Sequence, residues 1–351
     1  MLAASRGVDM EGVLPRHGSR ILLLPSLGFL LVAGGFLLLG WLAYLWLHPG
    51  PAPYRYALVD EGGVARFDKL GLEAWPDLAV GRYEVRVDGV NEALAVTHLA
   101  RRGDAPPVRL DWENRAGEPV GALDSRLSEL TALATAIGKH APKDAVVLAW
   151  WDTSRQIRLL AGRDTLFESH LGEPAIVPEQ WRGRSGAVDK VEREFWGAPA
   201  GTDERRNFQR FADALGADPA EGVAMLRELA GAREAYLAIH VTDLYKLGRM
   251  RPDRLDMAYK DFPMGANLHG LVGYLKSWMR DHGYVSYALQ SLSDNQVRAY
   301  FLRDGRSGNT LLAQMLPFTT SNPLELQAVQ LVYQHGSYWV YRIPSGQPSG
   351  G

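Results

Sequence analysis

The chain has 351 residues, of which 46% are hydrophobic and 22% are charged, so it can form a globular fold with a sizeable core. It contains no cysteine, which excludes disulfides, thiolate metal sites, c-type haem attachment and cysteine nucleophiles. The 38 basic residues are balanced by 40 acidic ones, so no nucleic-acid partner is expected.

An apolar run near the N-terminus predicts a membrane span. Residues Ile21–Leu47 form a stretch of 27 positions without a charged side chain. As a helix this stretch is about 40 Å long, which exceeds the ~30 Å hydrocarbon core of a bilayer. Three arginines lie within residues 1–20, whereas only Arg55 follows the run closely. The positive-inside rule therefore predicts a single-pass, uncleaved anchor in the inner membrane, with a cytoplasmic N-terminus and the main domain in the periplasm.

Residues 48–117 are expected to form a small β-rich region close to the membrane. Short segments rich in β-forming residues alternate there with Gly, Asp and Pro: Tyr54–Val59, Tyr83–Val87, Ala93–Leu99 and Val108–Trp112. This pattern is typical of an antiparallel sheet.

Residues 118–343 are expected to form a mixed α/β domain. Apolar residues from Leu123 to Ile137 follow one another at spacings of 4, 3, 4 and 3, which predicts a helix that ends at Gly138. A buried strand, Ala145–Trp150, follows, and then a short helix that ends at Gly162.

The pattern of helix, strand and polar turn recurs downstream. A helix is predicted to begin at Asp218 and Pro219, and the apolar strand Ala235–Val241 follows it. Two such units predict parallel strands covered by helices, which is an α/β core. The remaining predicted elements are a helix over Asn267–His282 and strands over Tyr284–Leu289, Val297–Leu302, Leu326–Tyr333 and Tyr338–Ile343. The tail, residues 344–351, is polar and expected to be disordered.

Two carboxylates lie at the carboxyl ends of predicted parallel strands. Asp152 and Asp243 each lie between a predicted strand and a helix, and ligands of α/β sheets bind at such ends. If the two strands are neighbours, both carboxylates face one crevice, with Arg155 and Arg158 able to neutralise them. The alternative is that each is only a helix N-cap.

Two tryptophans accompany the first carboxylate. Trp150 and Trp151 point to opposite sides of the strand if it stays extended, so one is expected in the core and the other near the crevice.

The segment Tyr259–Gly270 combines aromatic, charged and turn-forming residues just before a helix N-terminus. Backbone amides at that position can meet an anion or a carboxylate of a partner, so Tyr259, Phe262, Met264 and His269 are candidate binding residues. The alternative is a structural turn with Phe262 and Met264 in the core.

Motifs for metals and cofactors are missing. His240, Asp243, His269 and His282 lie within 43 residues, but none of the histidines forms the i, i+4 pair of a zinc protease. The sequence contains no G-x-S-x-G, P-loop or G-x-G-x-x-G motif. We expect no metal and no cofactor in the isolated chain.

Residues 144–166 resemble the WWD-centred segment of the soluble domain in the oligosaccharyltransferase catalytic subunit. The likeness rests on the run from Asp144 to Asp152 and on Gln156, Ile157, Gly162, Arg163, Thr165 and Leu166. In that family the Trp-Trp-Asp cluster binds the hydroxyl residue of the acceptor sequon, which implies a peptide-hydroxyl pocket at Trp150, Trp151 and Asp152. The family has Tyr-Gly where this chain has Thr153 and Ser154, and it carries its catalytic acids and metal in a membrane domain of many helices. The resemblance therefore implies a shared local fold and not glycosyl transfer.

Over most of its length the chain resembles the HaoB family of hydroxylamine oxidation accessory proteins of ammonia oxidisers and methanotrophs. The resemblance rests on the N-terminal anchor and on the segments Ala149–Arg158 and Ala258–Gly270. It implies a partner, the periplasmic multihaem c-type hydroxylamine oxidoreductase, whose haems would supply the electron transfer that a cysteine-free chain cannot.

Three functions follow as hypotheses. The leading one is a non-catalytic module that anchors or assembles the hydroxylamine oxidoreductase at the membrane. The second is an envelope protein that binds peptide or glycan through Trp150, Trp151 and Asp152. The third is an enzyme that uses the crevice between Asp152 and Asp243.

Overall fold

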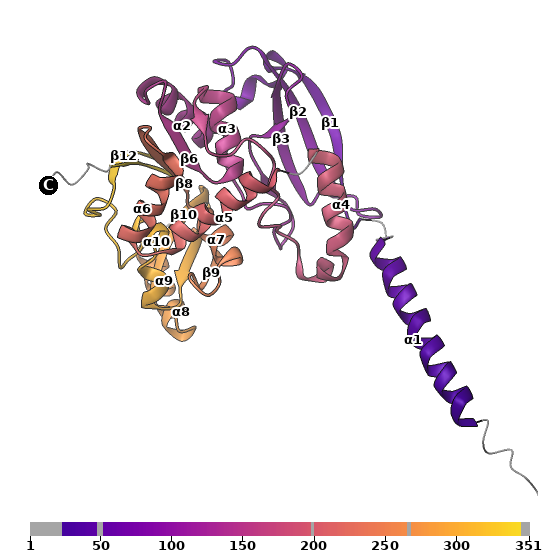
Figure 1. Cartoon of the computed structure of the whole chain (residues 1–351). Coiled ribbons are helices and arrows are strands. Elements are labelled where there is room, and N and C mark those ends of the chain that lie inside the picture. Colours follow the sequence, from indigo (N-terminus) through magenta and orange to yellow (C-terminus); the bar gives the residue numbers. More distant parts are fainter. Residues whose placement is uncertain (1–22, 48–51, 198–199, 265–267, 345–351) are drawn as a thin grey trace, which may run out of the picture. The chain divides into compact units, whose positions relative to one another are not determined.

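A computed structural model describes residues 23–47, 52–197, 200–264 and 268–344 (Figure 1). The chain divides into two compact units, Met1–Pro51 and Ala52–Gly351. The expectations for residues 1–20 and for the tail beyond Pro344 lie outside the described residues.

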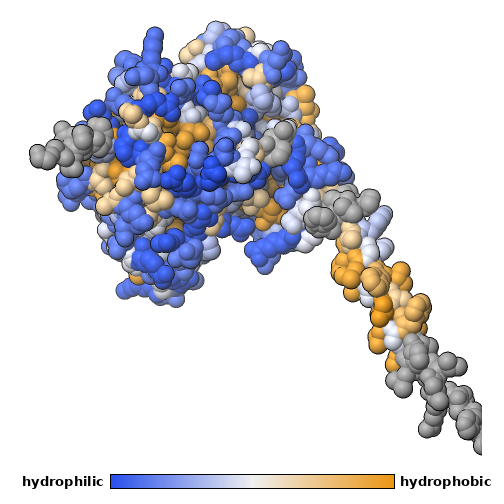
Figure 2. Space-filling model, viewed as in Figure 1, coloured by the Kyte–Doolittle hydropathy of each residue, from blue (hydrophilic) through white to orange (hydrophobic). Residues whose placement is uncertain are grey.

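The first unit contains one helix, α1 (Leu23–Leu47), in its described part. The stretch Leu27–Tyr44 within α1 is long and apolar enough to cross a membrane. Its large apolar side chains are exposed, and Figure 2 shows them along the helix. A helix of this kind suits a membrane anchor or a signal sequence.

The second unit begins with an antiparallel sheet, as predicted for this part of the chain. Its strands are β1 (Arg55–Gly63), β2 (Leu78–Arg86), β3 (Ala95–Arg102), β4 (Val108–Arg109) and β5 (Glu113–Asn114). The order is β1-β2-β3-β4, and β5 also pairs with β3. A 3-10 helix, η1 (Val64–Leu70), connects β1 to β2. Leu78, Val80 and Ala100 are buried on one face of this sheet.

A mixed sheet forms the centre of the unit, in the order β12-β13-β8-β6-β7. Its strands are β6 (Val146–Ala149), β7 (Asp164–Thr165), β8 (Ala235–His240), β12 (Gln330–His335) and β13 (Tyr338–Ile343). The strand β6 is parallel to both β7 and β8, whereas β13 runs antiparallel to β8. The predicted pair of parallel neighbouring strands is therefore confirmed.

Alternate residues of β6 enter two different cores. Val147 packs with the helices α2 (Leu127–His140) and α3 (Trp151–Ala161), while Val146 and Leu148 pack on the opposite side with α5 (Thr202–Gly216) and α6 (Pro219–Ala230). Burial of both faces explains why β6 is an unbroken apolar run. The mixed α/β class expected from the sequence is confirmed.

A third, antiparallel sheet has the order β10-β11-β9, with β9 (Met257–Pro263), β10 (Ser286–Ser293) and β11 (Gln296–Leu302). The helix α8 (Leu268–Asp281) covers one of its faces through Leu271 and Leu275. The remaining helices are η2 (Glu179–Arg184), α4 (Ser185–Trp196), α7 (Asp243–Met250), α9 (Gly305–Gly308) and α10 (Leu311–Gln314).

Several predicted boundaries are wrong. The helix expected from Leu123 to Gly138 is α2, which begins at Leu127 and continues to His140. Its end is set by Pro142, because the residue before a proline favours extended backbone, as Ala141 shows. The strand expected from Ala145 ends at Ala149, and the one expected from Leu326 is β12, which begins at Gln330.

The segment expected as a loop from Tyr259 begins in the strand β9, which continues to Pro263, and from Leu268 it belongs to α8. This strand pairs with β11, and Phe262 lies opposite Val297. Phe262 is buried at 2% exposure against Trp278 and Phe301, which corrects its interpretation as an exposed contact residue and supports the alternative of a core residue.

Candidate functional site

Two carboxylates meet one lysine at the carboxyl ends of β6 and β8. Asp152 lies in the first turn of α3, and Asp243 begins α7. The Lys246 ammonium donates to Asp152 Oδ2 at 3.0 Å and to Asp243 Oδ1 at 3.0 Å. The predicted convergence of the two carboxylates is therefore correct. The N-cap positions belong to Trp150 and Thr242, so neither carboxylate is an N-cap.

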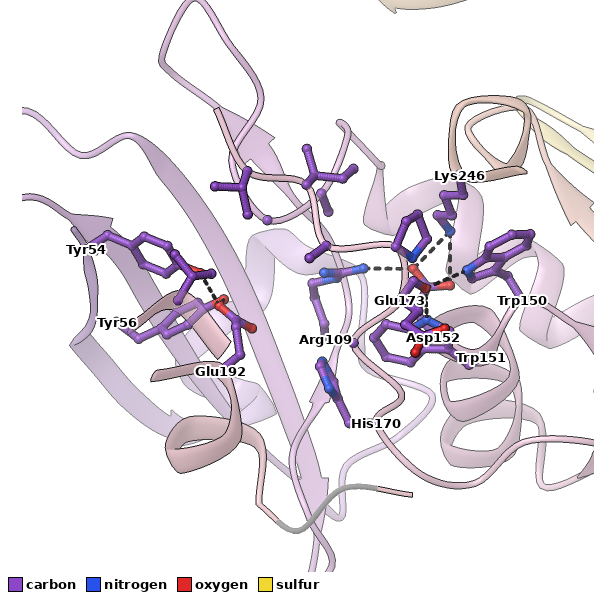
Figure 3. Close-up of a pocket in the computed structure, with 18 residues that line it drawn as sticks. Tyr54, Tyr56, Arg109, Trp150, Trp151, Asp152, His170, Glu173, Glu192 and Lys246 are labelled. Atoms are coloured by element: carbon purple, nitrogen blue, oxygen red, sulfur yellow. Dashed lines mark hydrogen bonds and ion pairs between the residues drawn. The ribbon is translucent and has the colours of Figure 1, made fainter. Parts of the chain in front are cut away.

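An arginine from the first sheet completes the network. Arg109 in β4 donates from Nη2 to Asp152 Oδ2 at 2.8 Å (Figure 3). The backbone N–H of Thr153 donates to Asp152 Oδ1, and that of His240 donates to Asp243 Oδ2. The network thus connects the first sheet to the helices at the end of the central sheet.

Burial and opposite charge act against each other in the network. Burial raises the pKa of Asp152, but Lys246 and Arg109 lower it by more, so it lies below the ordinary value. Burial lowers the pKa of Lys246, but the two carboxylates raise it above its ordinary value. Burial raises the pKa of Asp243, and Lys246 offsets only part of this effect. Asp152 and Lys246 are therefore both charged near neutral pH.

The charged states of these groups decide what the network can do. A lysine with a raised pKa holds its proton and is a poor nucleophile, and a carboxyl with a lowered pKa is a poor general acid. The side chains of Lys246 and Asp243 are only 10% and 1% exposed, so a substrate has little access to them. This arrangement suits a structural ion-pair network better than proton transfer.

The two tryptophans share one hydrogen-bond acceptor beside the network. The indole N–H of Trp151 donates to the Glu173 carbonyl oxygen at 2.6 Å, and that of Trp150 donates to the same oxygen at 3.3 Å. Both rings are buried in the core cluster that also contains Phe167 and Phe208. The strand β6 ends at Ala149, before both tryptophans, and Trp151 already belongs to α3. The condition under which they would point to opposite sides, an extended strand through both residues, is therefore not met, and both rings line the same cavity.

A small cavity lies beside Asp152 and the tryptophans. Its volume of about 50 Å³ holds a few water molecules and is too small for a peptide or a sugar. His170 lines the cavity, and the centre of its ring lies 4.3 Å from the centre of the Trp151 ring. Burial, with Arg109 and Arg155 nearby, lowers the pKa of His170 to about 3, so this side chain is neutral at pH 7.

The other predicted site residues are divided between this site and the third sheet. Arg155 is buried near Asp152, but its guanidinium donates to the Pro107 carbonyl oxygen at 2.8 Å. Arg158 pairs with Glu168 instead of the carboxylates. The residues Tyr259, Phe262 and Met264 belong to β9 and its end, and His269 to the start of α8, where its side chain lies outside the described part.

Sequence reasoning missed the two cations that matter most. Lys246 follows Asp243 by three residues on one helix, a spacing that places both side chains on the same face, so it was detectable. Arg109 is 43 residues from Asp152, and no local pattern connects the two. Among the described residues, no group of three or more His, Asp or Glu side chains has the arrangement of a metal site.

A family model described as "HaoA-associated protein HaoB" matches residues 20–343. No curated protein matches the chain. Among solved structures, the C-terminal domain of PglB from C. jejuni is 12% identical with a TM-score of 0.36, and the match covers 61% of this chain and 99% of that one. The C-terminal globular domain of the oligosaccharyltransferase AglB from Archaeoglobus fulgidus is 11% identical with a TM-score of 0.29, covering 61% and 95%. These are domains of the kind that residues 144–166 resemble.

Proposed function

The chain belongs to the family of the HaoA-associated protein HaoB, and from this premise we propose that it is a membrane-anchored, non-catalytic protein that binds or assembles the hydroxylamine oxidoreductase HaoA. The observation that carries the proposal is the family match over residues 20–343, which includes the apolar helix and nearly all of the second unit. Membership of the family makes the chain a HaoA-associated accessory protein of nitrification. What we propose beyond this is that the chain is anchored in the membrane and that it binds its multihaem partner directly.

The apolar helix supports the membrane part of the proposal. α1 spans 25 residues, which is about 38 Å at the helical rise and enough to cross a bilayer with tilt. The arginines before the helix favour a cytoplasmic N-terminus. We therefore propose that the second unit lies in the periplasm, where c-type haem proteins of this kind are expected.

The geometry of the ion-pair network supports a non-catalytic role. Asp152 receives hydrogen bonds from Lys246, Arg109 and the Thr153 amide, so little of its acceptor capacity remains for a substrate. For the same reason, the alternative of an enzyme with a crevice between Asp152 and Asp243 is less favoured.

The alternative of a peptide-binding pocket is also less favoured. Both tryptophan N–H groups are already bonded to the Glu173 carbonyl oxygen, and the adjoining cavity has room for a few waters. A peptide hydroxyl would have to replace bonds within the chain itself.

Co-purification tests the proposed association. The full chain with a C-terminal affinity tag is extracted from native membranes in mild detergent, and the eluate is analysed by haem staining and mass spectrometry. We expect HaoA as a haem-staining partner in stoichiometric amount, and tagged HaoA should recover this chain in the reciprocal experiment. A membrane protein of similar abundance with the same tag is the control. Absence of HaoA from both eluates, with both proteins expressed, contradicts the proposal.

A further inference from the structure

A carboxylate without a cationic partner lies at the other end of the same cavity. Glu192 in α4 accepts hydrogen bonds from the Tyr54 hydroxyl at 2.5 Å and the Tyr56 hydroxyl at 2.9 Å, both to Oε1. Its Oε2 accepts a hydrogen bond from the Trp196 indole N–H at 2.8 Å. Figure 3 shows Glu192 beside the two tyrosines, away from Asp152 and Lys246. All three donors are neutral.

The acceptor capacity of Glu192 is not used up. A carboxylate offers about four acceptor positions, and three are occupied here. No ion pair to Glu192 occurs within the described part of the chain, and the nearby cations are engaged elsewhere. Lys190 pairs with Glu194, Arg109 pairs with Asp152, and Arg205 pairs with Glu173. Arg193 donates from Nε to the Asp189 carbonyl oxygen. One position on Oε2 is therefore available to a donor from outside the chain.

Aromatic rings surround the carboxylate. Pairs of rings stack with centroid separations of 5.5 Å for Tyr54 and Trp181, 3.9 Å for Tyr56 and Phe195, and 4.5 Å for His170 and Trp196. The faces of aromatic rings attract cations, most strongly for tryptophan. His170 adds no positive charge to this environment at neutral pH, because its pKa is lowered to about 3 by burial.

Glu192 also lines two neighbouring cavities. The smaller is the cavity of about 50 Å³ that reaches Asp152. The larger, of about 260 Å³, is lined by Trp196, by three carboxylates and by two arginines: Glu173, Asp189, Glu192, Arg193 and Arg205. Arg205 pairs with Glu173, so the lining keeps an excess of negative charge. The size of this cavity suits a short aliphatic chain with a charged head and not a large cofactor.

We propose that Glu192, with the aromatic side chains around it, binds a protonated primary amine, either a free alkylamine or the end of a lysine side chain from a partner. An ammonium group donates to the open position on Glu192 Oε2, and its alkyl chain packs against Trp196 in the larger cavity. A primary ammonium suits the site because it combines a hydrogen-bond donor with a charge that the rings attract. This proposal does not depend on the association with HaoA.

Calorimetric titration of the full chain in detergent tests the proposal. Butylammonium chloride is titrated at constant ionic strength, with 1-butanol as the uncharged control. We expect saturable binding of butylammonium and none of 1-butanol. Glu192→Gln keeps an oxygen for both tyrosine hydroxyls but removes the charge, and it should weaken binding at least about tenfold. Glu194→Gln is the matched control, because Glu194 is exposed two positions along the same helix, and it should leave binding unchanged.

A second variant and a second ligand complete the test. If Glu192→Gln fails to fold, Phe195→Leu replaces one ring while the three hydrogen bonds to Glu192 remain, and it should weaken binding about threefold to tenfold. Nα-acetyl-lysine methylamide is then compared with butylammonium. Binding of both ligands supports a site for free amines, and binding of the lysine derivative alone supports a partner's lysine. No saturable binding of either ligand, or equal binding by the folded Glu192→Gln variant, overturns the proposal.

Discussion

At the scale of single residues, the ion-pair network is costly to interrupt. Lys246 and Asp243 are almost inaccessible, so removing one charge leaves the others without compensation in a poorly solvated place. Surface ion pairs in the same unit differ, because water screens them and replaces a lost partner. The pair between Arg158 and Glu168, at 44% and 62% side-chain exposure, is of this second kind.

We predict that Asp152→Asn lowers the free energy of unfolding by about 3–5 kcal/mol, because it leaves Lys246 and Arg109 with one carboxylate fewer. Arg158→Gln should cost less than about 1 kcal/mol. Chemical denaturation of the full chain in detergent, followed by tryptophan fluorescence, measures both. Equal effects of the two substitutions would show that the network is no more important than a surface pair.

A second residue-scale prediction concerns pH. Burial, with Lys246 nearby, lowers the pKa of His240 from 6.5 to about 3. Below pH 6.5 the unfolded chain therefore binds a proton at this residue that the folded chain does not, so stability falls as pH decreases from 6.5 toward 3. Between pH 7 and pH 5 the loss from His240 should be about 2 kcal/mol.

His240→Asn tests this pH dependence. The asparagine oxygen takes the place of Nδ1, which accepts the Thr242 backbone N–H in the wild type. Denaturation midpoints of both proteins are compared at pH 7 and pH 5, and the variant should lose less stability over this interval. The difference in slope isolates His240, because the other titrating groups are common to both proteins. Parallel slopes would contradict a strongly lowered pKa of His240.

At the scale of elements, one glycine permits the close approach of two helices. A Cβ at Gly222 in α6 would lie 2.3 Å from the Ala214 carbonyl oxygen of α5, which is closer than any real contact. A Cβ at Gly273 in α8, an exposed position, would have no neighbouring atom within 4 Å. The two glycines occupy similar helical backbone but differ in what a side chain would meet.

We therefore expect opposite effects from the same substitution at these positions. Gly222→Ala should destabilise the protein by at least about 1–3 kcal/mol, because α5 and α6 must separate. Gly273→Ala should stabilise it by up to about 1 kcal/mol through helix propensity. Thermal unfolding followed by circular dichroism compares the two. Stabilisation by Gly222→Ala would mean that the two helices are not in close contact at this position.

The elements also show what the sequence could and could not predict. Unbroken apolar runs such as β6 were recognised, because burial on both faces leaves a local pattern. For Phe262 the sequence leaves burial and exposure as alternatives, because β9 is an edge strand with charged neighbours, and the helix that covers it, α8, comes later in the chain. Arg109 was missed, since its partner Asp152 is brought near only by the packing of the first sheet. Interactions within one helix, such as Asp243 with Lys246, are predictable from local spacing, whereas the contact of Arg109 in β4 with Asp152 in α3 depends on the packing of distant elements.

At the scale of the whole molecule, the two units on either side of the division at Pro51 differ in where their apolar side chains lie. The first unit exposes apolar side chains along α1, whereas the second has its apolar residues in several buried cores. A helix such as α1 serves either as a retained anchor or as a cleaved signal sequence. The two possibilities differ in whether residues 21–47 remain on the mature chain.

We predict a retained anchor with the N-terminus in the cytoplasm, because the uncharged run is longer than a secretory signal and its flanking arginines precede it. An N-terminal tag should therefore remain on the membrane-bound protein, and a C-terminal alkaline phosphatase fusion should be active. Replacing Arg6, Arg16 and Arg20 by glutamate should lower the phosphatase activity per molecule, whereas replacement by lysine should not. Loss of the N-terminal tag would identify a signal sequence. Phosphatase activity absent from the wild-type fusion would place the second unit in the cytoplasm, where it could not meet a periplasmic partner.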